Sequence, residues 1–157
     1  MTAIPFTIRS ATEADRTAIL GLMRPRDYNR IHLKTECFVV AEEAGRVIGI
    51  GQIKRHWEGT PELASLVVAA QRRGKGVGSA IVRALVERHT GLLYLFCLVA
   101  LQGYYEQFGF RRARLAELPV LLAGILLLGN SLGWLPRLIG RQRMQVIAMR
   151  RLGGAYT

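Results

Sequence analysis

The residues best suited to chemistry lie in a glycine-rich stretch, QRRGKG at residues 71–76, with Gly78 close behind. Glycine lets the backbone adopt positive φ and approach a ligand closely. An apolar run precedes the stretch at Leu63 to Ala69, and a helical pattern follows it at Val77 to His89. The first turn of such a helix has unpaired N–H groups and the positive end of the helix dipole, which favour phosphate. Strand, loop and helix therefore predict an anion-binding cradle.

Two common nucleotide-binding motifs do not fit this loop. The P-loop requires GxxxxGK[ST], which the loop lacks. The dinucleotide fingerprint GxGxxG would need a glycine or alanine where Ser79 stands, and an acidic residue about 20 positions further on. The next acid after Glu87 is Glu106, in a different local setting. We therefore expect a different phosphate compound in the cradle.

A second motif, GYYEQFGF at residues 103–110, follows another apolar strand-like run at Leu92 to Val99. The first motif matches Q/R-x-x-G-x-G/A and the second is similar to F-Y-E-x-x-G-F, so the chain resembles the GNAT family of N-acetyltransferases. The resemblance implies an α/β fold with a mixed, splayed sheet of six to seven strands flanked by helices. It also implies a single domain over residues 1–157 and acetyl-CoA as co-substrate.

The resemblance implies that backbone N–H groups of the glycine loop hold the CoA pyrophosphate, while the pantetheine arm lies beside the preceding strand. The cofactor-binding residues expected on this basis are Leu66, Val67, Val68, Arg73, Gly74, Lys75, Gly76, Val77, Gly78 and Ser79. No His, Cys, Asp or Glu cluster has the spacing of metal ligands, so no metal is expected.

Two residues are candidates for catalysis. Tyr105 aligns with the general acid of the family, and a phenol with a reference pKa of about 10 can protonate a thiolate. Glu62 opens the central strand, where several family members have a general base; an exposed glutamate at a strand end is the alternative. Tyr104 is expected in the core, and His56 is expected at the surface or in a lid rather than in catalysis.

A basic segment, Arg24 to Lys34, occupies the region that overhangs the acceptor site in the family. Its candidate substrate residues are Arg24, Arg26, Tyr28 and Arg30, together with His32; a solvated loop is the alternative. The expected reaction is direct attack of a primary amine of a small molecule or peptide on acetyl-CoA, in a ternary complex. A non-catalytic acyl-CoA sensor or interaction module is the alternative from another functional class.

A second resemblance concerns the acceptor. The strand ELASLVV, the strand LYLFCL and the Leu118-Pro119 pair are similar to the acetyltransferase domain of N-acetylglutamate synthases. Those enzymes have a tryptophan–phenylalanine pair where this chain has Tyr104 and Tyr105. Glutamate is therefore kept as an alternative acceptor, and the arginines from Arg24 to Arg30 would then bind its carboxylates.

Composition limits the partners and the compartment. The 157 residues carry a net charge of +11, which suits CoA and would also suit nucleic acid or an acidic membrane. No nucleic-acid-binding motif appears, so no such partner is expected. Two cysteines without metal spacing and an N-terminus without an apolar leader favour a cytoplasmic protein.

The remaining pattern predicts four strands, at Pro5 to Ser10, Cys37 to Glu42, Arg46 to His56 and Met144 to Arg151, with a helix after Thr12. The segment Leu118 to Pro136 has no charge and is long enough for a membrane span. A span would prevent the last strand from rejoining the sheet. We therefore expect no span, but a helix that covers the core, a homodimer interface or a membrane surface.

Overall fold

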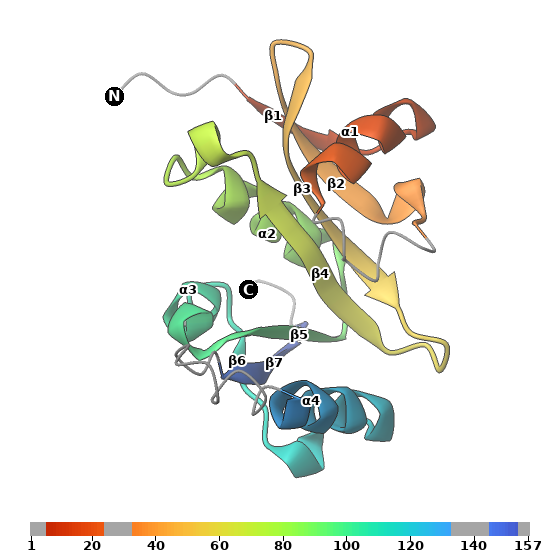
Figure 1. Ribbon diagram of the computed structural model, residues 1–157, viewed down its shortest axis with the longest axis vertical. Coiled ribbons are helices and arrows are strands. Elements are labelled where there is room, and N and C mark those ends of the chain that lie inside the picture. Colours follow the sequence, from red (N-terminus) through yellow and green to blue (C-terminus); the bar gives the residue numbers. More distant parts are fainter. Residues whose placement is uncertain (1–5, 24–32, 133–144, 154–157) are drawn as a thin grey trace. The chain divides into compact units, whose positions relative to one another are not determined.

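The computed structural model describes residues 6–23, 33–132 and 145–153 (Figure 1). These residues fall into two compact units, one within Met1–Lys54 and Leu63–Thr90, the other within Arg55–Glu62 and Gly91–Thr157. Seven strands accompany the helices, so the expected α/β class and strand number are confirmed. The single domain over residues 1–157 stays a prediction.

The first unit is built on four strands in the order β1-β2-β3-β4. Their bounds are Thr7–Ser10 for β1, Phe38–Glu43 for β2, Arg46–Arg55 for β3 and Pro61–Val68 for β4. The helices of this unit are α1, Arg16–Leu22, and α2, Val77–Arg88. Strand β2 pairs antiparallel with both β1 and β3, and the predicted hairpin turns at Ala44 and Gly45, both with positive φ.

The helix α1 begins after a short 3-10 turn, Glu13–Asp15, which follows Thr12 as predicted, and a capping box is present at Thr12. The backbone N–H and the hydroxyl of Thr12 both donate to Asp15, at 2.8 and 3.1 Å. Arg9 donates two further hydrogen bonds to the same carboxylate. The Arg9 hydrogen bonds have the largest effect on the pKa of Asp15 and hold it far below its usual range. Burial acts in the opposite direction but is the smaller effect.

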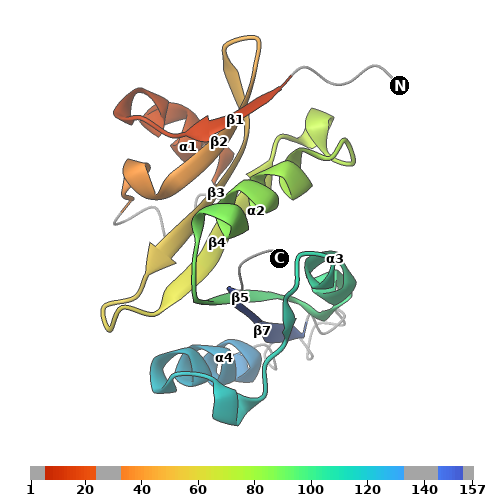
Figure 2. The same cartoon turned by 180° about the vertical axis from the view of Figure 1, so that it is seen from behind.

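The helices α1 and α2 lie on opposite faces of these strands (Figures 1 and 2). On one face, the paired residues Val40 and Ile50 pack with Ile19 of α1 and with Met23, which follows the helix. On the other face, Gly51 lies opposite Val39 in the pairing and close to α2. Alternation along β2 and β3 therefore supplies a large-residue face for α1 and a glycine-containing face for α2.

The two glycines of β3 have a steric role that the sequence did not reveal. A Cβ on Gly51 would lie 2.7 Å from Ile81 Cγ2 and 3.1 Å from Leu85 Cδ1. A Cβ on Gly49 would lie 2.9 Å from Ile81 Cδ1. The β2–β3 pair is also irregular, since its register shifts between Ala41 and Glu42. The glycines therefore let α2 approach the sheet closely.

Replacing Gly51 with alanine is expected to destabilise the protein by about 1–3 kcal/mol, because the added methyl group overpacks a filled helix–sheet contact. Gly21 in α1 is the matched control, since a Cβ there meets nothing within 4 Å. Gly21→Ala should be neutral or stabilising by up to about 1 kcal/mol, because alanine favours a helix. Urea unfolding of both variants measures the difference, and equal effects would contradict the steric role.

The second unit is built on three strands in the order β5-β7-β6, each pair antiparallel. Their bounds are Leu92–Leu98 for β5, Arg111–Arg112 for β6 and Val146–Leu152 for β7. Its helices are α3, Gln102–Glu106, and α4, Val120–Leu132. The predicted last strand is confirmed as β7, whereas β6 was not predicted. The expected parallel pairing of the strands at 63–69 and 92–99 joins the two units and stays a prediction.

The uncharged segment forms α4 over its first part. Leu122 of α4 is fully buried and packs in a cluster with Leu118, Tyr94 of β5 and Ala148 of β7. The expectation that this helix covers core residues is therefore correct for one of its faces. None of the helices in the described ranges combines the length and hydropathy of a membrane span.

Candidate active site

The glycine loop has the backbone conformation that its sequence predicts. Gly74 and Gly76 have φ of 73° and 81°, in the left-handed region that glycine adopts readily. A Cβ at either position would meet nothing within 4 Å, so the space beside the loop is open. Backbone conformation rather than crowding therefore accounts for the two glycines.

The loop leads directly into α2, which starts at Val77 as predicted. Val77 is buried and anchors the first turn, while the loop residues from Arg73 to Gly76 are exposed. The N-cap of α2 is Gly76, which has no side chain that could cap the helix. A helix N-terminus that begins with glycine leaves room for an anion beside its first turn, which is an arrangement suited to phosphate.

Three basic residues lie in the glycine loop, and they differ in their hydrogen-bond partners. Arg72 donates two hydrogen bonds to Glu43, at 2.8 and 2.5 Å, so its charge is neutralised within the fold. Arg73 donates from Nε to the carbonyl of Val68 at 3.2 Å, on the exposed side of the loop. Lys75 is exposed. Arg73 and Lys75 therefore supply the positive charge at the cradle.

The strand before the loop, β4, has an irregular backbone at Ser65, which has φ of 53°. A non-glycine residue in this region costs about 1 kcal/mol or more and persists only where its surroundings hold it. The hydroxyl of Ser65 accepts a hydrogen bond from the buried Gln52 of β3 at 3.0 Å. Ser65 precedes Leu66, Val67 and Val68, which are all half-buried rather than alternating between buried and exposed.

Tyr105 lies on α3 and is only 7% exposed, whereas the neighbouring Tyr104 is half-buried. The two rings meet edge to face at 5.0 Å, and Phe110 lies edge to face with Tyr105 at 6.2 Å. Burial, followed by the neighbouring Tyr104 and Cys97, raises the pKa of Tyr105 well above its usual value. The phenol is therefore protonated throughout the physiological range. Of this pair Tyr105, not Tyr104, is the core residue.

The turn after α3 is fixed by a buried arginine of β7. Arg151 donates from Nε to the carbonyl of Phe108 at 3.0 Å, and its side chain lies 3.4 Å from the Cβ position of Gly109. Gly109 has φ of 83°, which explains the glycine of the FGF segment. Arg151 thereby fixes the end of the segment that carries Tyr105.

Glu62 is buried, with 8% of its side chain exposed, and it is paired with His56. The Nε2 atom of His56 lies 2.6 Å from Oε2 of Glu62, and the imidazole is 12% exposed. The turn between them is held by the His56 N–H donating to Thr60 and the Gly59 N–H donating to His56. The alternative of an exposed glutamate at position 62 is therefore wrong, and so is the prediction that His56 lies at the surface. The two side chains form one contact pair with little exposure to solvent.

Comparison with known proteins decides the family. A profile described as an acetyltransferase (GNAT) domain matches residues 34–112, about half of the chain. The chain belongs to this GNAT family. An uncharacterized N-acetyltransferase of Chlorobaculum tepidum is 29% identical over 122 residues, which are 71% of this chain and 79% of that protein.

Solved structures share the GNAT fold at low sequence identity. N-acetylglutamate synthase from Neisseria gonorrhoeae, in complex with coenzyme A and N-acetyl-glutamate, has a TM-score of 0.68 and 20% identity over 93% of this chain. This chain spans only 34% of that synthase. A Mycobacterium tuberculosis protein in complex with CoA and a second ligand has a TM-score of 0.66 and 17% identity, covering 93% of this chain and 98% of the other. These neighbours establish the α/β GNAT fold.

The candidate acceptor residues of this GNAT chain lie outside the described residues. This applies to Arg24, Arg26, Tyr28, Arg30 and His32. The described part nevertheless reveals three contacts that the sequence did not predict: His56 with Glu62, Ser65 with Gln52, and Arg151 with the turn after Tyr105. The segment His56 to Thr60 carries a signal for the first of them, since Gly59 predicts a turn that brings the two ends together.

Proposed function

We propose that this chain transfers the acetyl group of acetyl-CoA to a primary amine of a small molecule or peptide. The observation that carries the proposal is the glycine N-cap of α2, in a loop with two glycines of positive φ. The residues proposed to hold the CoA pyrophosphate are Arg73, Gly74, Lys75, Gly76, Val77, Gly78 and Ser79, with Leu66, Val67 and Val68 beside the pantetheine arm.

The proposed reaction is a direct attack in a ternary complex. The amine nitrogen bonds to the thioester carbonyl carbon, the carbon–sulfur bond breaks, and the sulfur leaves with the electron pair. Tyr105 gives a proton or a strong hydrogen bond to this sulfur, which a phenol kept neutral by burial can do. Holding both reactants in position supplies roughly 7–11 kcal/mol of the barrier.

The proton of the attacking amine is proposed to go to Glu62. An ammonium has no lone pair, so the amine must be deprotonated before or during attack. His56 contacts the Glu62 carboxylate at 2.6 Å and fixes its orientation. His56 is therefore a positioning residue, and Glu62 is the proton acceptor, directly or through a water molecule.

An amino acid of the glutamate type is the second candidate acceptor. It is favoured by the structural likeness to a synthase solved with N-acetyl-glutamate, of which this chain spans about a third. The non-enzymatic alternative is a sensor that binds acyl-CoA without catalysing its reaction. The family membership favours an acyltransferase over this sensor.

The proposed function is tested by two measurements on the full chain. Calorimetry with CoA tests the cradle, and a thiol-release assay with acetyl-CoA tests amino acids, polyamines, aminoglycosides and peptide N-termini as acceptors. Binding together with turnover of any amine supports the enzyme. Binding without turnover across the panel supports the sensor, and absence of CoA binding overturns the proposal.

Replacing Gly76 with alanine is expected to weaken CoA binding at least about tenfold, because a strained residue at the N-cap displaces first-turn donors from the phosphate. Gly45, with φ of 74° and no atom within 4 Å of its Cβ position, is the matched control in the β2–β3 hairpin. Both variants should lose about 1 kcal/mol of stability through the same backbone strain. Calorimetric affinities that fall equally in both variants would contradict the cradle.

A further inference from the structure

One face of α4 is apolar and uncovered by any described residue. Val120 is 92% exposed and Leu128 is 64% exposed, and Ile125 and Leu127 are exposed as well. The opposite face of the helix is buried at Leu122. A helix with apolar residues on both faces normally has a partner on each of them.

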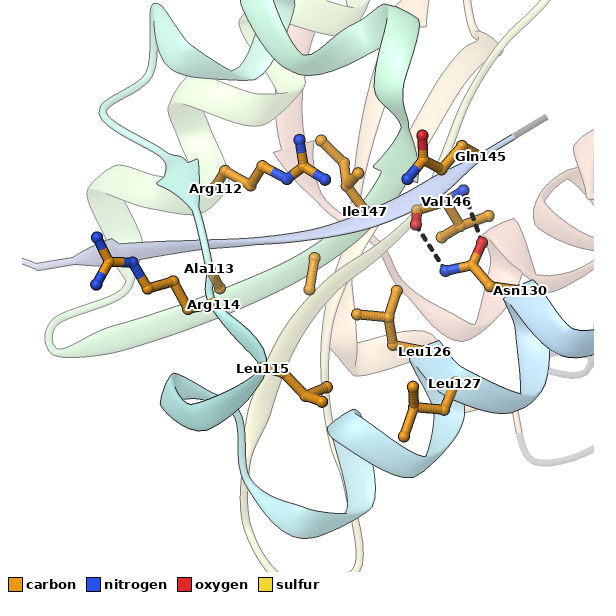
Figure 3. Close-up of a pocket in the computed structure, with 11 residues that line it drawn as sticks. Arg112, Ala113, Arg114, Leu115, Leu126, Leu127, Asn130, Gln145, Val146 and Ile147 are labelled. Atoms are coloured by element: carbon orange, nitrogen blue, oxygen red, sulfur yellow. Dashed lines mark hydrogen bonds between the residues drawn. The ribbon is translucent and has the colours of Figure 1, made fainter. Parts of the chain in front are cut away.

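A groove of about 540 Å³ lies beside this face, between α4 and the β6–β7 edge. Figure 3 shows Leu115 and Leu127 facing each other across it, with Arg112 and Arg114 on the β6 side. Asn130 of α4 donates to the carbonyl of Val146 at 3.0 Å and accepts from its N–H at 3.2 Å. These two bonds fix the helix against β7, so the exposed face has a defined orientation.

The charge around the groove is strongly positive. Glu117 is the only acid in the segment from residue 107 to residue 157, and it already binds Arg111 at 3.0 Å and Arg150 at 2.6 Å. Arg112 and Arg114 are exposed, and neither forms an ion pair with a described residue. Residues 91–157 contain eight arginines and two glutamates, so this part of the sequence is strongly basic.

We propose that α4 docks this protein onto an anionic lipid bilayer. The apolar face of α4 would enter the headgroup–acyl boundary, while Arg112 and Arg114 contact lipid phosphates. A bilayer with anionic lipids provides an apolar layer and a negative layer next to each other, which matches the apolar helix face with arginines along one side. Each arginine near such a surface strengthens binding by about fivefold.

A second copy of the chain fits the same surface less well. In a two-fold dimer each copy presents the same patch, so the arginines beside α4 would approach their own equivalents. Only Glu117 could offset them, and it is already bound to Arg111 and Arg150. An anionic bilayer relieves this repulsion, whereas a second copy adds to it.

Sedimentation with vesicles tests the proposal on the full chain. We expect binding to vesicles of phosphatidylcholine and phosphatidylglycerol in equal parts, much weaker binding to phosphatidylcholine alone, and a loss of affinity as salt rises. The double variant Val120→Gln/Leu128→Gln should bind at least about tenfold more weakly. Arg112→Gln should bind about fivefold more weakly and with a shallower salt dependence.

Two control variants make the same chemical changes elsewhere. Leu152→Gln removes another exposed leucine, and Arg83→Gln removes an exposed arginine of α2. Both should bind the mixed vesicles within about twofold of the parent, apart from the small effect of one net charge. Failure of the parent to bind at low salt overturns the proposal, and so do controls that lose as much affinity as the α4 variants.

Two further outcomes assign the face to a different occupant. If light scattering finds a dimer that Val120→Gln/Leu128→Gln dissociates, the face is a subunit interface and the lipid proposal fails. If the double variant lowers the melting temperature far more than Leu152→Gln does, the chain itself covers the face, and the proposal also fails. A monomer of unchanged stability that no longer sediments supports the lipid surface.

Discussion

Replacing Tyr105 with phenylalanine is expected to lower kcat about 10²- to 10³-fold and to leave CoA affinity within about twofold. The ring of Tyr105 is packed against Tyr104 and Phe110, and phenylalanine keeps those contacts. Only the hydroxyl is lost. Since burial raises the pKa of this phenol, the group stays protonated as pH rises through the neutral and mildly alkaline range. We therefore expect no alkaline loss of wild-type activity from Tyr105 between about pH 7 and 10.

Tyr104→Phe is the matched control, because it removes the same hydroxyl from the adjacent, half-buried residue. Steady-state kinetics of the two variants, together with CoA affinities from calorimetry, show whether Tyr105 donates a proton or only packs. A tenfold or smaller effect of Tyr105→Phe, or equal effects of the two variants, would show that Tyr105 is only a packing residue. Unchanged CoA binding with lost turnover supports proton donation to the sulfur.

The glycine loop and its helix could be predicted from sequence because their determinants are local. Glycines at 74 and 76 specify the left-handed backbone, and the apolar spacing from Val77 specifies the helix start. The observed helix ends at Arg88, one residue before the predicted end. Strands β2, β3 and β5 also lie within one residue of their predicted bounds. Local backbone preference and periodicity are sufficient for these elements.

Features that depend on long-range packing could not be predicted in the same way. A glycine within a strand does not show which side chain lies above it, and only the structure reveals that Ile81 excludes a Cβ at Gly51. Serine carries no signal for positive φ, so the backbone irregularity of β4 at Ser65 could not be predicted. The short strand β6 has two residues, and its pairing with β7 rather than any periodicity defines it. In each case the deciding contact comes from a distant part of the chain.

The His56–Glu62 pair could be predicted only in part, because both the local sequence and distant contacts determine it. Six residues separate the two side chains, and Gly59 with φ of 92° indicates a turn between them. Their burial, however, depends on neighbours that the local sequence does not specify. The imidazole was therefore assigned to the surface, and its contact with Glu62 changed that interpretation. The contact also suggests how the proposed base can be tested.

Replacing Glu62 with glutamine is expected to lower kcat/KM for the amine about 10²- to 10³-fold, because the amide keeps the shape of the side chain but cannot accept a proton. CoA affinity should change less than about twofold, because the proposed cradle does not include Glu62. The loss should shrink as pH rises toward the ammonium–amine equilibrium of the acceptor, since a larger share of it is then already deprotonated. Glu58→Gln, an exposed acid in the same turn, is the matched control and should keep kcat/KM within about twofold.

Variants of His56 test whether the proposed base, Glu62, depends on its contact with the imidazole. His56→Ala removes the group that lies 2.6 Å from Glu62, while His56→Gln keeps an N–H donor of similar reach. We expect the alanine variant to lose about 10- to 100-fold in kcat/KM and the glutamine variant to recover part of that loss. Because the residues act as a unit, the double variant Glu62→Gln/His56→Ala should be no slower than Glu62→Gln alone. Additive losses, or a pH profile of Glu62→Gln parallel to that of wild type, would assign the pair a purely structural role in the β3–β4 turn.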